Sequence, residues 1–295
     1  MQRFEFQGQS IAYVRSGKGA PVVFLHNGGT SHSIWDEVAG KISAHREVFA
    51  IDLPGYGESS KPGTGYELGS YVRLIEEFVS AHELAQVTLV GNCMGSAISL
   101  AYASAHPERV RALVLVNPLT EATFAAGSLG TIRRLDQGAP KLARLMFGLA
   151  GRLRMPRWSA GPVISMQLGG MGRAAGVAQT AFLREAHASR GQLRSLLGVV
   201  EDFDSYAALD RFSPAPDFPP ICTIWGIENR ILSADAGMEL NRTLRPRRQE
   251  WLEGCGHLCM MERPGAVAEI IEDFLSNCEQ GRGEAAAANK VESVA

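Results

Sequence analysis

One cysteine occurs where its thiol could act as a nucleophile. Cys93 lies in the segment Val90–Ser96, between an apolar run and an Ala-rich stretch with helical spacing. Its neighbours Gly91 and Gly95 permit the sharp strand-to-helix turn that lifts a nucleophile above a sheet. Free amides at the start of a helix favour a thiolate, so we expect this turn to lower the pKa of Cys93. The alternative is a buried, inert cysteine beside two packing glycines.

The composition indicates a folded protein with a large core. The chain has 295 residues, of which 45% are hydrophobic, and it can form one domain with an insertion or two small domains. No run approaches the ~18 consecutive apolar residues of a membrane span. The first residues also lack the apolar core of a signal peptide. We therefore expect a cytoplasmic protein without a membrane span.

Charge and cysteine usage narrow the possible partners and cofactors. The net charge is only −2, so we expect no nucleic-acid partner. The five cysteines are an odd number without a repeated spacing, which fits a reducing compartment rather than a disulfide framework. The segment Cys255-Gly-His257-Leu-Cys259 has no second Cys/His pair to complete a zinc site. We therefore expect neither a metal nor another cofactor.

Strand-like and helix-like stretches alternate along most of the chain. Apolar runs predict strands at residues 3–7, 11–14, 22–25, 47–52, 86–90, 111–116, 221–225 and 248–252. Apolar residues at helical spacing predict helices over 71–78, after Cys93 and over 267–275. This alternation predicts a parallel α/β sheet, whose ligand site lies at the carboxyl ends of the strands.

The alternation breaks once, in the middle of the chain. Over residues 119–210, Gly-punctuated helical segments rich in Leu, Met and Arg replace strands, which predicts a helical lid inserted into a core of residues 1–118 and 211–278. The tail, residues 279–295, has no core-forming pattern and is expected to be disordered. Four lid methionines fit ordinary packing, and their adaptable thioethers would also suit an acyl chain: Met146, Met155, Met166 and Met171.

Four motifs together resemble those of the α/β-hydrolase superfamily. In chain order they are His26-Asn27-Gly28-Gly29 with Trp35 downstream, Asp52-x-Pro54-Gly55-x-Gly57-x-Ser59, Gly91-x-Cys93-x-Gly95, and Gly254-Cys-Gly256-His257 followed by Glu262-Arg-Pro264. The resemblance covers residues 1 to 278. It implies an α/β-hydrolase fold, in which helices flank a mostly parallel central sheet and an inserted helical lid covers the pocket. Cysteine replaces the usual serine of the elbow, as in superfamily members with a cysteine nucleophile.

The resemblance also implies roles for individual residues. Cys93 would be the nucleophile, His257 the general base, and the backbone amides of Gly28 and Met94 the oxyanion-hole donors. His26 is expected to brace the oxyanion loop. Three further residues lie near these motifs and could line the pocket: Asn27, His32 and Asn92.

The sequence departs from the family pattern at the acid of the catalytic triad. Relatives place it after the strand at 221–225 or after the strand at 111–116, and these two positions hold Asn229 and Asn117. A cysteine paired with histidine can rest as thiolate and imidazolium, so an amide that only orients the ring could suffice. We therefore expect Asn229 to orient His257. Possible substitutes for the missing acid are Glu228, Asn117 and Glu121.

These roles predict acyl transfer through a covalent acyl-Cys93 thioester. Since a thioester intermediate is nearly isoenergetic with a thioester donor, we expect an acyl or aminoacyl transferase, or a thioesterase, that acts on thioester-bound acyl groups. Two alternatives stay open: a hydrolase of small esters or lactones, and a non-catalytic binding protein on the same fold.

The charges of the lid suggest how a substrate could be presented. Residues 119–200 contain eleven basic and three acidic residues, a net charge of +8, which leaves −10 for the rest of a chain whose total is −2. Such a face would suit an acidic carrier protein or the phosphates of CoA. Ordinary solvated helix faces are the alternative.

Overall fold

The computed structural model describes residues 1–292, with side chains described through residue 280. In this part of the chain, eight strands form one sheet in the order β1-β2-β4-β3-β5-β6-β7-β8. The strands are β1 (Gln2–Phe6), β2 (Gln9–Ser16), β3 (Pro21–Leu25), β4 (Glu47–Ile51), β5 (Val87–Asn92), β6 (Val110–Val116), β7 (Ile221–Gly226) and β8 (Arg248–Leu252). Each strand predicted from the sequence is present.

The sheet is mostly parallel. The β1–β2 and β2–β4 pairs are antiparallel, whereas all pairs from β4 through β8 are parallel. Strands β5 and β7 are buried along their whole length, as expected for parallel strands covered on both faces. The predicted α/β fold class is confirmed, and the carboxyl ends of the parallel strands meet at one edge, where ligands bind in such sheets.

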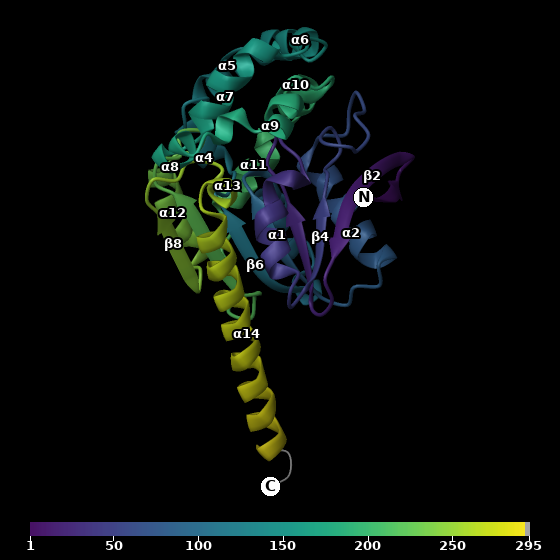
Figure 1. The fold of residues 1–295 in the computed structure, drawn as a ribbon, viewed down its shortest axis with the longest axis vertical. Helices are drawn as coiled ribbons and strands as arrows, with labels where there is room; N and C mark the ends of the chain where they lie inside the picture. Colours follow the sequence, from purple (N-terminus) through teal and green to yellow (C-terminus); the bar gives the residue numbers. More distant parts are fainter. Residues whose placement is uncertain (293–295) are drawn as a thin grey trace.

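Helices cover both faces of the sheet and extend beyond its end (Figure 1). In chain order they are α1 (Asp36–Ile42), α2 (Leu68–Ala81), α3 (Met94–Ala105), α4 (Glu121–Ala125), α5 (Gly130–Gly138), α6 (Pro140–Ala150), α7 (Ala160–Gln167), α8 (Gly170–Ala174), α9 (Ala181–His187), α10 (Gln192–Glu201), α11 (Phe203–Asp210), α12 (Ala234–Leu244), α13 (Cys259–Glu262) and α14 (Pro264–Glu292).

Each face of the sheet has its own hydrophobic core because side chains alternate along a strand. Val23 and Leu25 of β3 pack with residues of α2 and α3 in one core. Val22 and Phe24 of the same strand pack with residues of α1 and α14 in the other. The predicted apolar face of α2 is buried in the first core.

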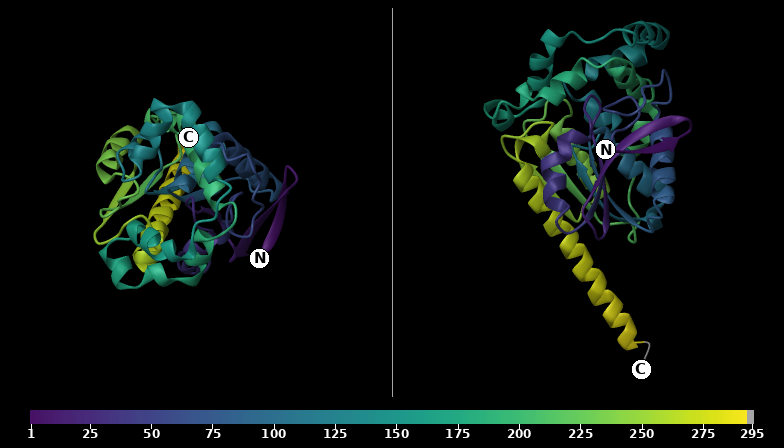
Figure 2. Two further views of the ribbon diagram at one scale, coloured as in Figure 1. Left: turned by 90° about the horizontal axis from the view of Figure 1, so that it is seen from above. Right: turned by 45° about the vertical axis from the view of Figure 1, so that its right-hand side comes forward.

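Between β6 and β7 the chain forms helices α4 to α11, and we call residues 121–210 the insertion. Figures 1 and 2 show these helices gathered at one end of the sheet. The insertion is therefore positioned to form the roof of any pocket at that end.

Two further observations concern the helices. Among the described residues, no helix is long and apolar enough to cross a membrane. Helix α14 continues to Glu292, and the disorder expected over 279–295 stays a prediction. The consecutive alanines at 285–288 have the highest helix propensity of any residue and favour this continuation. Residues 293–295 lie outside the described residues.

Candidate active site

Cys93 lies at a strained turn between β5 and α3. Its φ is +53° and its ψ is −110°, a conformation that L-residues rarely adopt and that is found mainly at functional sites. The flanking glycines make the turn possible, because a Cβ on Gly95 would lie 2.2 Å from the Leu25 carbonyl oxygen and one on Gly91 would lie 2.3 Å from the Gly95 carbonyl. The backbone amide of Cys93 donates to the Val116 carbonyl at 2.9 Å, which joins the elbow to β6.

The thiol of Cys93 is buried, with 8% of the residue exposed. Burial raises the pKa of Cys93 to about 12, and a hydrogen bond from the Met94 amide opposes this only in part. The expected lowering of this pKa by the helix start is therefore wrong. In this pocket the loss of hydration outweighs the hydrogen bond from the Met94 amide.

His257 lies in the loop between β8 and α13, and its ring faces Asn229. The backbone amide of His257 donates to the Gln167 carbonyl at 2.6 Å. Its Nδ1 lies 3.3 Å from Asn229 Oδ1. Because Oδ1 also accepts from the amides of Ile231 at 3.0 Å and Leu232 at 3.2 Å, this atom is identified as the oxygen, and His257 Nδ1 is the donor. The tautomer leaves Nε2 as the basic nitrogen.

The resting pair is neutral. Burial lowers the pKa of His257 to about 3, while that of Cys93 is raised to about 12. At neutral pH the ring is therefore uncharged and the thiol keeps its proton. The resting state is therefore not the thiolate–imidazolium pair that would allow an amide to replace the triad acid at position 229.

Asn229 contacts the His257 ring through its Oδ1, but the Nδ2 of the same amide makes no hydrogen bond in the described part of the chain. The burial of this Nδ2 carries a desolvation cost. The two backbone amides beside its Oδ1 form an environment that would also stabilise a carboxylate.

Neither glutamate considered as a substitute acid is brought to the ring. Glu228 accepts from the Gly170 amide at 2.9 Å and pairs with Arg173 at 3.2 Å, and its side chain is 41% exposed. Glu121 pairs with Arg133 at 3.1 Å. Both carboxylates therefore pair with groups of the insertion and not with His257.

Asn117 and Asn92 hold the histidine loop rather than the ring. Asn117, with a φ of +44°, accepts from the Gly226 amide at 3.0 Å and donates to the His257 carbonyl at 3.2 Å. Asn92 donates to the same carbonyl at 3.2 Å and to Asn27 Oδ1 at 3.2 Å. These amides join the ends of β5 and β6 to the His257 loop. Asn117 therefore does not contact the ring as a substitute for the triad acid, and Asn92 does not line the catalytic cavity.

The loop after β3 is braced by two histidines. His26 donates from Nδ1 to the Asn27 carbonyl at 2.7 Å and accepts the Leu53 amide at Nε2, 3.0 Å away. This is the bracing role expected for it, and burial lowers its pKa to about 4. His32 does not line the catalytic cavity described next, because its Nδ1 pairs with buried Asp52 at 2.8 Å.

A cavity of 360 Å³, which we call the catalytic cavity, contains both Cys93 and His257. Gly28, Met94 and Asn27 also line it. Among the described residues the amide of Gly28 has no carbonyl acceptor, and that of Met94 faces the sulfur of Cys93. Both residues border the catalytic cavity, and the role of their amides as oxyanion donors stays a prediction.

The walls of the catalytic cavity are mostly apolar and come largely from the insertion. Lys, Arg, Asp and Glu are absent from its described lining. Met155 and Met166 line it, whereas Met146 and Met171 are exposed. Sequence reasoning missed its polar residues Gln167, His187 and Gln192, because no motif marks them.

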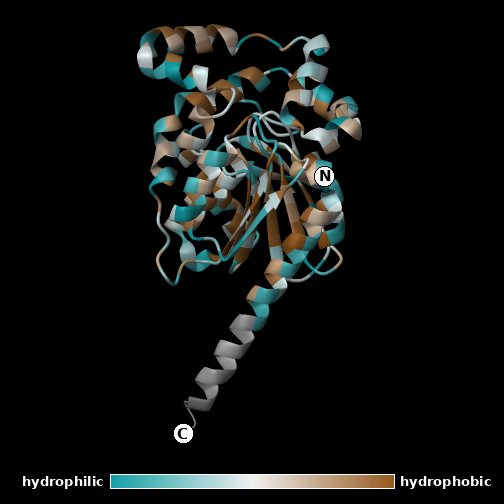
Figure 3. Cartoon of the chain, turned by 90° about the vertical axis from the view of Figure 1, so that its left-hand side faces the viewer, coloured by the Kyte–Doolittle hydropathy of each residue, from teal (hydrophilic) through white to brown (hydrophobic). Residues whose placement is uncertain are grey.

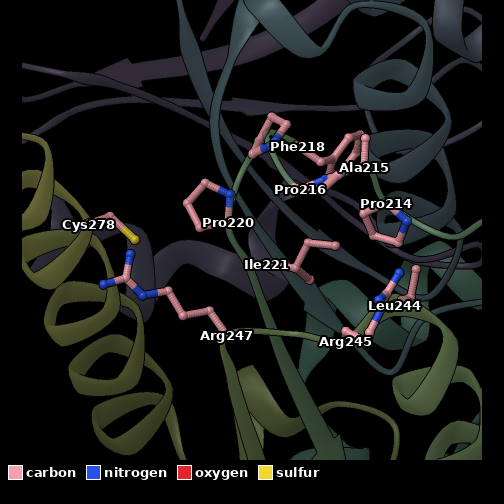
Figure 4. A pocket seen from close by; sticks show the side chains of 11 residues that line it. Pro214, Ala215, Pro216, Phe218, Pro220, Ile221, Leu244, Arg245, Arg247 and Cys278 are labelled. Carbon is pink, nitrogen blue, oxygen red and sulfur yellow. The ribbon is translucent and has the colours of Figure 1, made fainter.

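A larger cavity of 660 Å³ lies elsewhere. Figure 4 shows its lining, with Pro214, Pro216 and Pro220 near the start of β7 and Arg247 beside Cys278. It lies at the amino end of β7, opposite the carboxyl ends at which parallel sheets bind ligands. We therefore place the candidate active site in the smaller catalytic cavity.

A sequence profile described as "alpha/beta hydrolase fold" matches residues 20–264. The chain belongs to this family. The 2-hydroxy-6-oxo-2,4-heptadienoate hydrolase of Pseudomonas putida is 28% identical over 88% of this chain and 90% of that protein. A haloalkane dehalogenase of Agrobacterium fabrum is 40% identical over 112 residues, which are 38% of this chain and 37% of that protein.

Solved structures show the same fold in this α/β hydrolase. One, described as "Est816 as an N-Acyl homoserine lactone degrading enzyme", superposes with a TM-score of 0.73 at 19% identity, over 92% of this chain and 100% of that one. The expected superfamily and fold are confirmed.

Proposed function

We propose that this α/β hydrolase cleaves uncharged, apolar esters or lactones through an acyl-Cys93 intermediate. The observation that carries the proposal is the catalytic cavity, which combines a cysteine at a strained elbow, a histidine with a free Nε2 and a lining without Lys, Arg, Asp or Glu among its described residues. An apolar lining favours an acyl chain and excludes charged groups that it cannot solvate.

The mechanism starts from neutral partners. As Cys93 Sγ attacks the carbonyl carbon, His257 Nε2 accepts the thiol proton, and the amides of Gly28 and Met94 donate to the oxyanion. The carbon–oxygen bond to the leaving group then breaks, and the imidazolium protonates the departing alkoxide. Water attacks the thioester with His257 as base, the carbon–sulfur bond breaks, and the proton returns to sulfur.

Hydrolysis fits the comparisons better than transfer between thioesters. The relatives named above are a hydrolase, a dehalogenase and a lactone-degrading enzyme. The uncharged lining offers no partner for a phosphate inside the cavity. The transferase or thioesterase that we expected from the cysteine is therefore the second candidate, and its support is the nucleophile type alone.

The test is to trap the acyl-enzyme with a neutral apolar ester, p-nitrophenyl butyrate. Intact-protein mass spectrometry should detect one butyryl adduct on Cys93 that disappears as butyrate forms. Cys93→Ala should give neither adduct nor turnover, whereas Cys278→Ala should keep both. A persistent adduct that leaves only when a thiol or amine is added would favour transfer. Absence of any adduct, with turnover unchanged in Cys93→Ala, would exclude the proposed nucleophile.

A further inference from the structure

Helix α6 and the segment after it expose an unusual number of large apolar side chains. Leu145 is 61% exposed, Leu149 56% and Leu153 63%, and Trp158 is 80% exposed. Leu142 and Met146 are also exposed and share the helical spacing of Leu145 and Leu149. The opposite side of α6 is buried through Ala143 and Phe147. In Figure 3 the uppermost helices, which belong to the insertion, mix hydrophobic and hydrophilic residues.

Basic residues accompany these apolar side chains. We define the α6 face as the apolar residues Leu142, Leu145, Met146, Leu149, Leu153 and Trp158 together with the basic residues Lys141, Arg144, Arg152, Arg154 and Arg157. No Asp or Glu occurs anywhere between Asp136 and Glu185. Within the described residues, none of the five basic side chains forms an ion pair or hydrogen bond.

Three other arginines of the insertion are already neutralised by acidic partners. Arg133 is buried and pairs with Glu121, Asp136 and Asp204. Arg194 pairs with Glu201 at 2.6 Å, and Arg173 pairs with Glu228. Of the eight basic residues of the lid without a described acidic partner, five lie on the α6 face, where they coincide with the exposed apolar groups, and the other three are Arg134, Arg184 and Arg190.

This combination fits an anionic lipid surface. Helices that lie in a membrane interface have this pattern, in which exposed Leu, Met and Trp at helical spacing are flanked by Lys and Arg. Each basic residue near an anionic surface strengthens binding about fivefold. A second copy fits less well, because a two-fold interface would bring the five unpaired cations of each copy together. A purely acidic partner would leave the apolar groups without a matching surface.

We propose that the α6 face docks this protein peripherally on anionic phospholipid membranes. The apolar side chains enter the headgroup boundary while the basic residues contact lipid phosphates. The face adjoins the catalytic cavity, because Met155, which lies between Arg154 and Arg157 in the chain, lines that cavity. Nearby parts of the insertion line it too, through Leu129, Ile132 and Val163. Docking itself does not depend on the proposed hydrolysis. Delivery of an apolar ester from the bilayer into the catalytic cavity does rest on it.

Vesicle sedimentation of the full chain tests the docking. The wild type should bind vesicles of phosphatidylcholine and phosphatidylglycerol in a 3:1 ratio, bind pure phosphatidylcholine at least about tenfold less, and lose affinity as salt rises. Lys141→Gln with Arg144→Gln should weaken binding about tenfold or more, because each cation contributes about fivefold. Leu145→Ser with Leu149→Ser should weaken it on both lipid compositions.

Matched controls separate the α6 face from general charge or hydrophobicity. Arg73→Gln on α2 and Met238→Ser on α12, both exposed, should bind as the wild type does, and Cys93→Ala should bind equally while losing turnover. Equal effects of control and α6 variants would overturn the proposal, as would absence of wild-type binding. Tight binding to polyglutamate without vesicle binding would assign the face to an acidic macromolecule. Dimers in sedimentation velocity that the leucine variants dissociate, again without vesicle binding, would assign it to self-association.

Discussion

At the scale of single residues, the catalytic pair illustrates how burial can reverse a local rule. The helix start and the Met94 amide favour a thiolate at Cys93, but the cavity removes the water that would solvate it. The same loss of water keeps His257 neutral. Substrate attack therefore has to create both charges together, and the orientation of the ring by Asn229 gains importance.

Alkylation kinetics test the raised pKa of Cys93. A pKa of about 12 in place of 9.0 implies about 1000-fold less thiolate at neutral pH than in a free thiol. The rate of iodoacetamide labelling at Cys93, mapped by peptide mass spectrometry, should rise about tenfold per pH unit to beyond pH 10. A plateau below pH 8 would instead indicate a resting thiolate.

Substitution at position 229 tests the missing charge. In Asn229→Asp, the carboxylate would accept from the Ile231 and Leu232 amides and from His257 Nδ1, and it would raise the pKa of His257. The imidazolium formed during attack would be stabilised, so kcat/KM should rise about tenfold or more. The acid limb of the pH–rate profile, set near the His257 pKa of about 3, should move to higher pH.

The control for this substitution is Glu228→Gln, which alters a carboxylate paired with Arg173 rather than with the ring. It should leave both kcat/KM and the acid limb unchanged. A similar change in both variants would show that the effect comes from net charge near the sheet edge and not from contact with His257.

At the scale of elements, the elbow depends on how closely α3 approaches the sheet. A Cβ at Gly95 would meet the Leu25 carbonyl oxygen at 2.2 Å, so Gly95→Ala must separate helix α3 from strand β3. We expect a loss of about 3 kcal/mol in the free energy of unfolding, measured by urea denaturation, together with loss of activity.

The matched variant is Gly40→Ala in α1, where an added Cβ meets nothing within 4 Å. Because alanine favours the helix, this variant should gain about 0.5–1 kcal/mol. If both glycine variants were equally stable, close packing of the elbow would not explain the glycine at 95.

The elements also show where sequence reasoning succeeds. The strands are predictable because each is a short apolar run bounded by turn residues, and the motifs at their ends place Cys93, His257 and Asn229 at one edge of the sheet. The contacts of the insertion are not predictable in this way. Gln192 and His187 reach the cavity only through packing between distant helices, and Asn117 braces the histidine loop through contacts across more than one hundred residues.

At the scale of the whole molecule, charge and titration depend on which groups the fold brings together. The lid charge counted from sequence over 119–200 omitted the acidic residues that follow. Glu201 and Asp204 pair with Arg194 and Arg133, so the surplus is smaller than expected, and five of its basic residues lie on the α6 face. The titration of histidines also depends on the fold, because burial keeps His26 and His257 in the neutral form.

These two buried histidines should therefore lower the free energy of unfolding as the pH decreases. The pKa of His257 is about 3 and that of His26 about 4 in the folded protein, against 6.5 for the ordinary imidazole. Between these values the unfolded chain binds more protons than the native one, so acid favours unfolding. From pH 7 to pH 5, each ring should cost about 2 kcal/mol. His32 acts in the opposite direction, since Asp52 raises its pKa against the effect of burial. Three carboxyls whose pKa burial raises also act in the opposite direction: Asp36, Asp210 and Glu262.

Comparison of variants isolates one ring from the other titrating groups. His257→Gln removes one of the two buried imidazoles, so the decrease in unfolding free energy from pH 7 to pH 5 should be about 2 kcal/mol smaller than in the wild type. Cys93→Ala alters the same cavity but keeps the imidazole, and should retain the wild-type pH dependence. Urea denaturation at both pH values gives the measurement. The opposite result would be an equal decrease in unfolding free energy from pH 7 to pH 5 in His257→Gln and Cys93→Ala. It would mean that the ring is solvated in the native state and that the resting pair is not neutral.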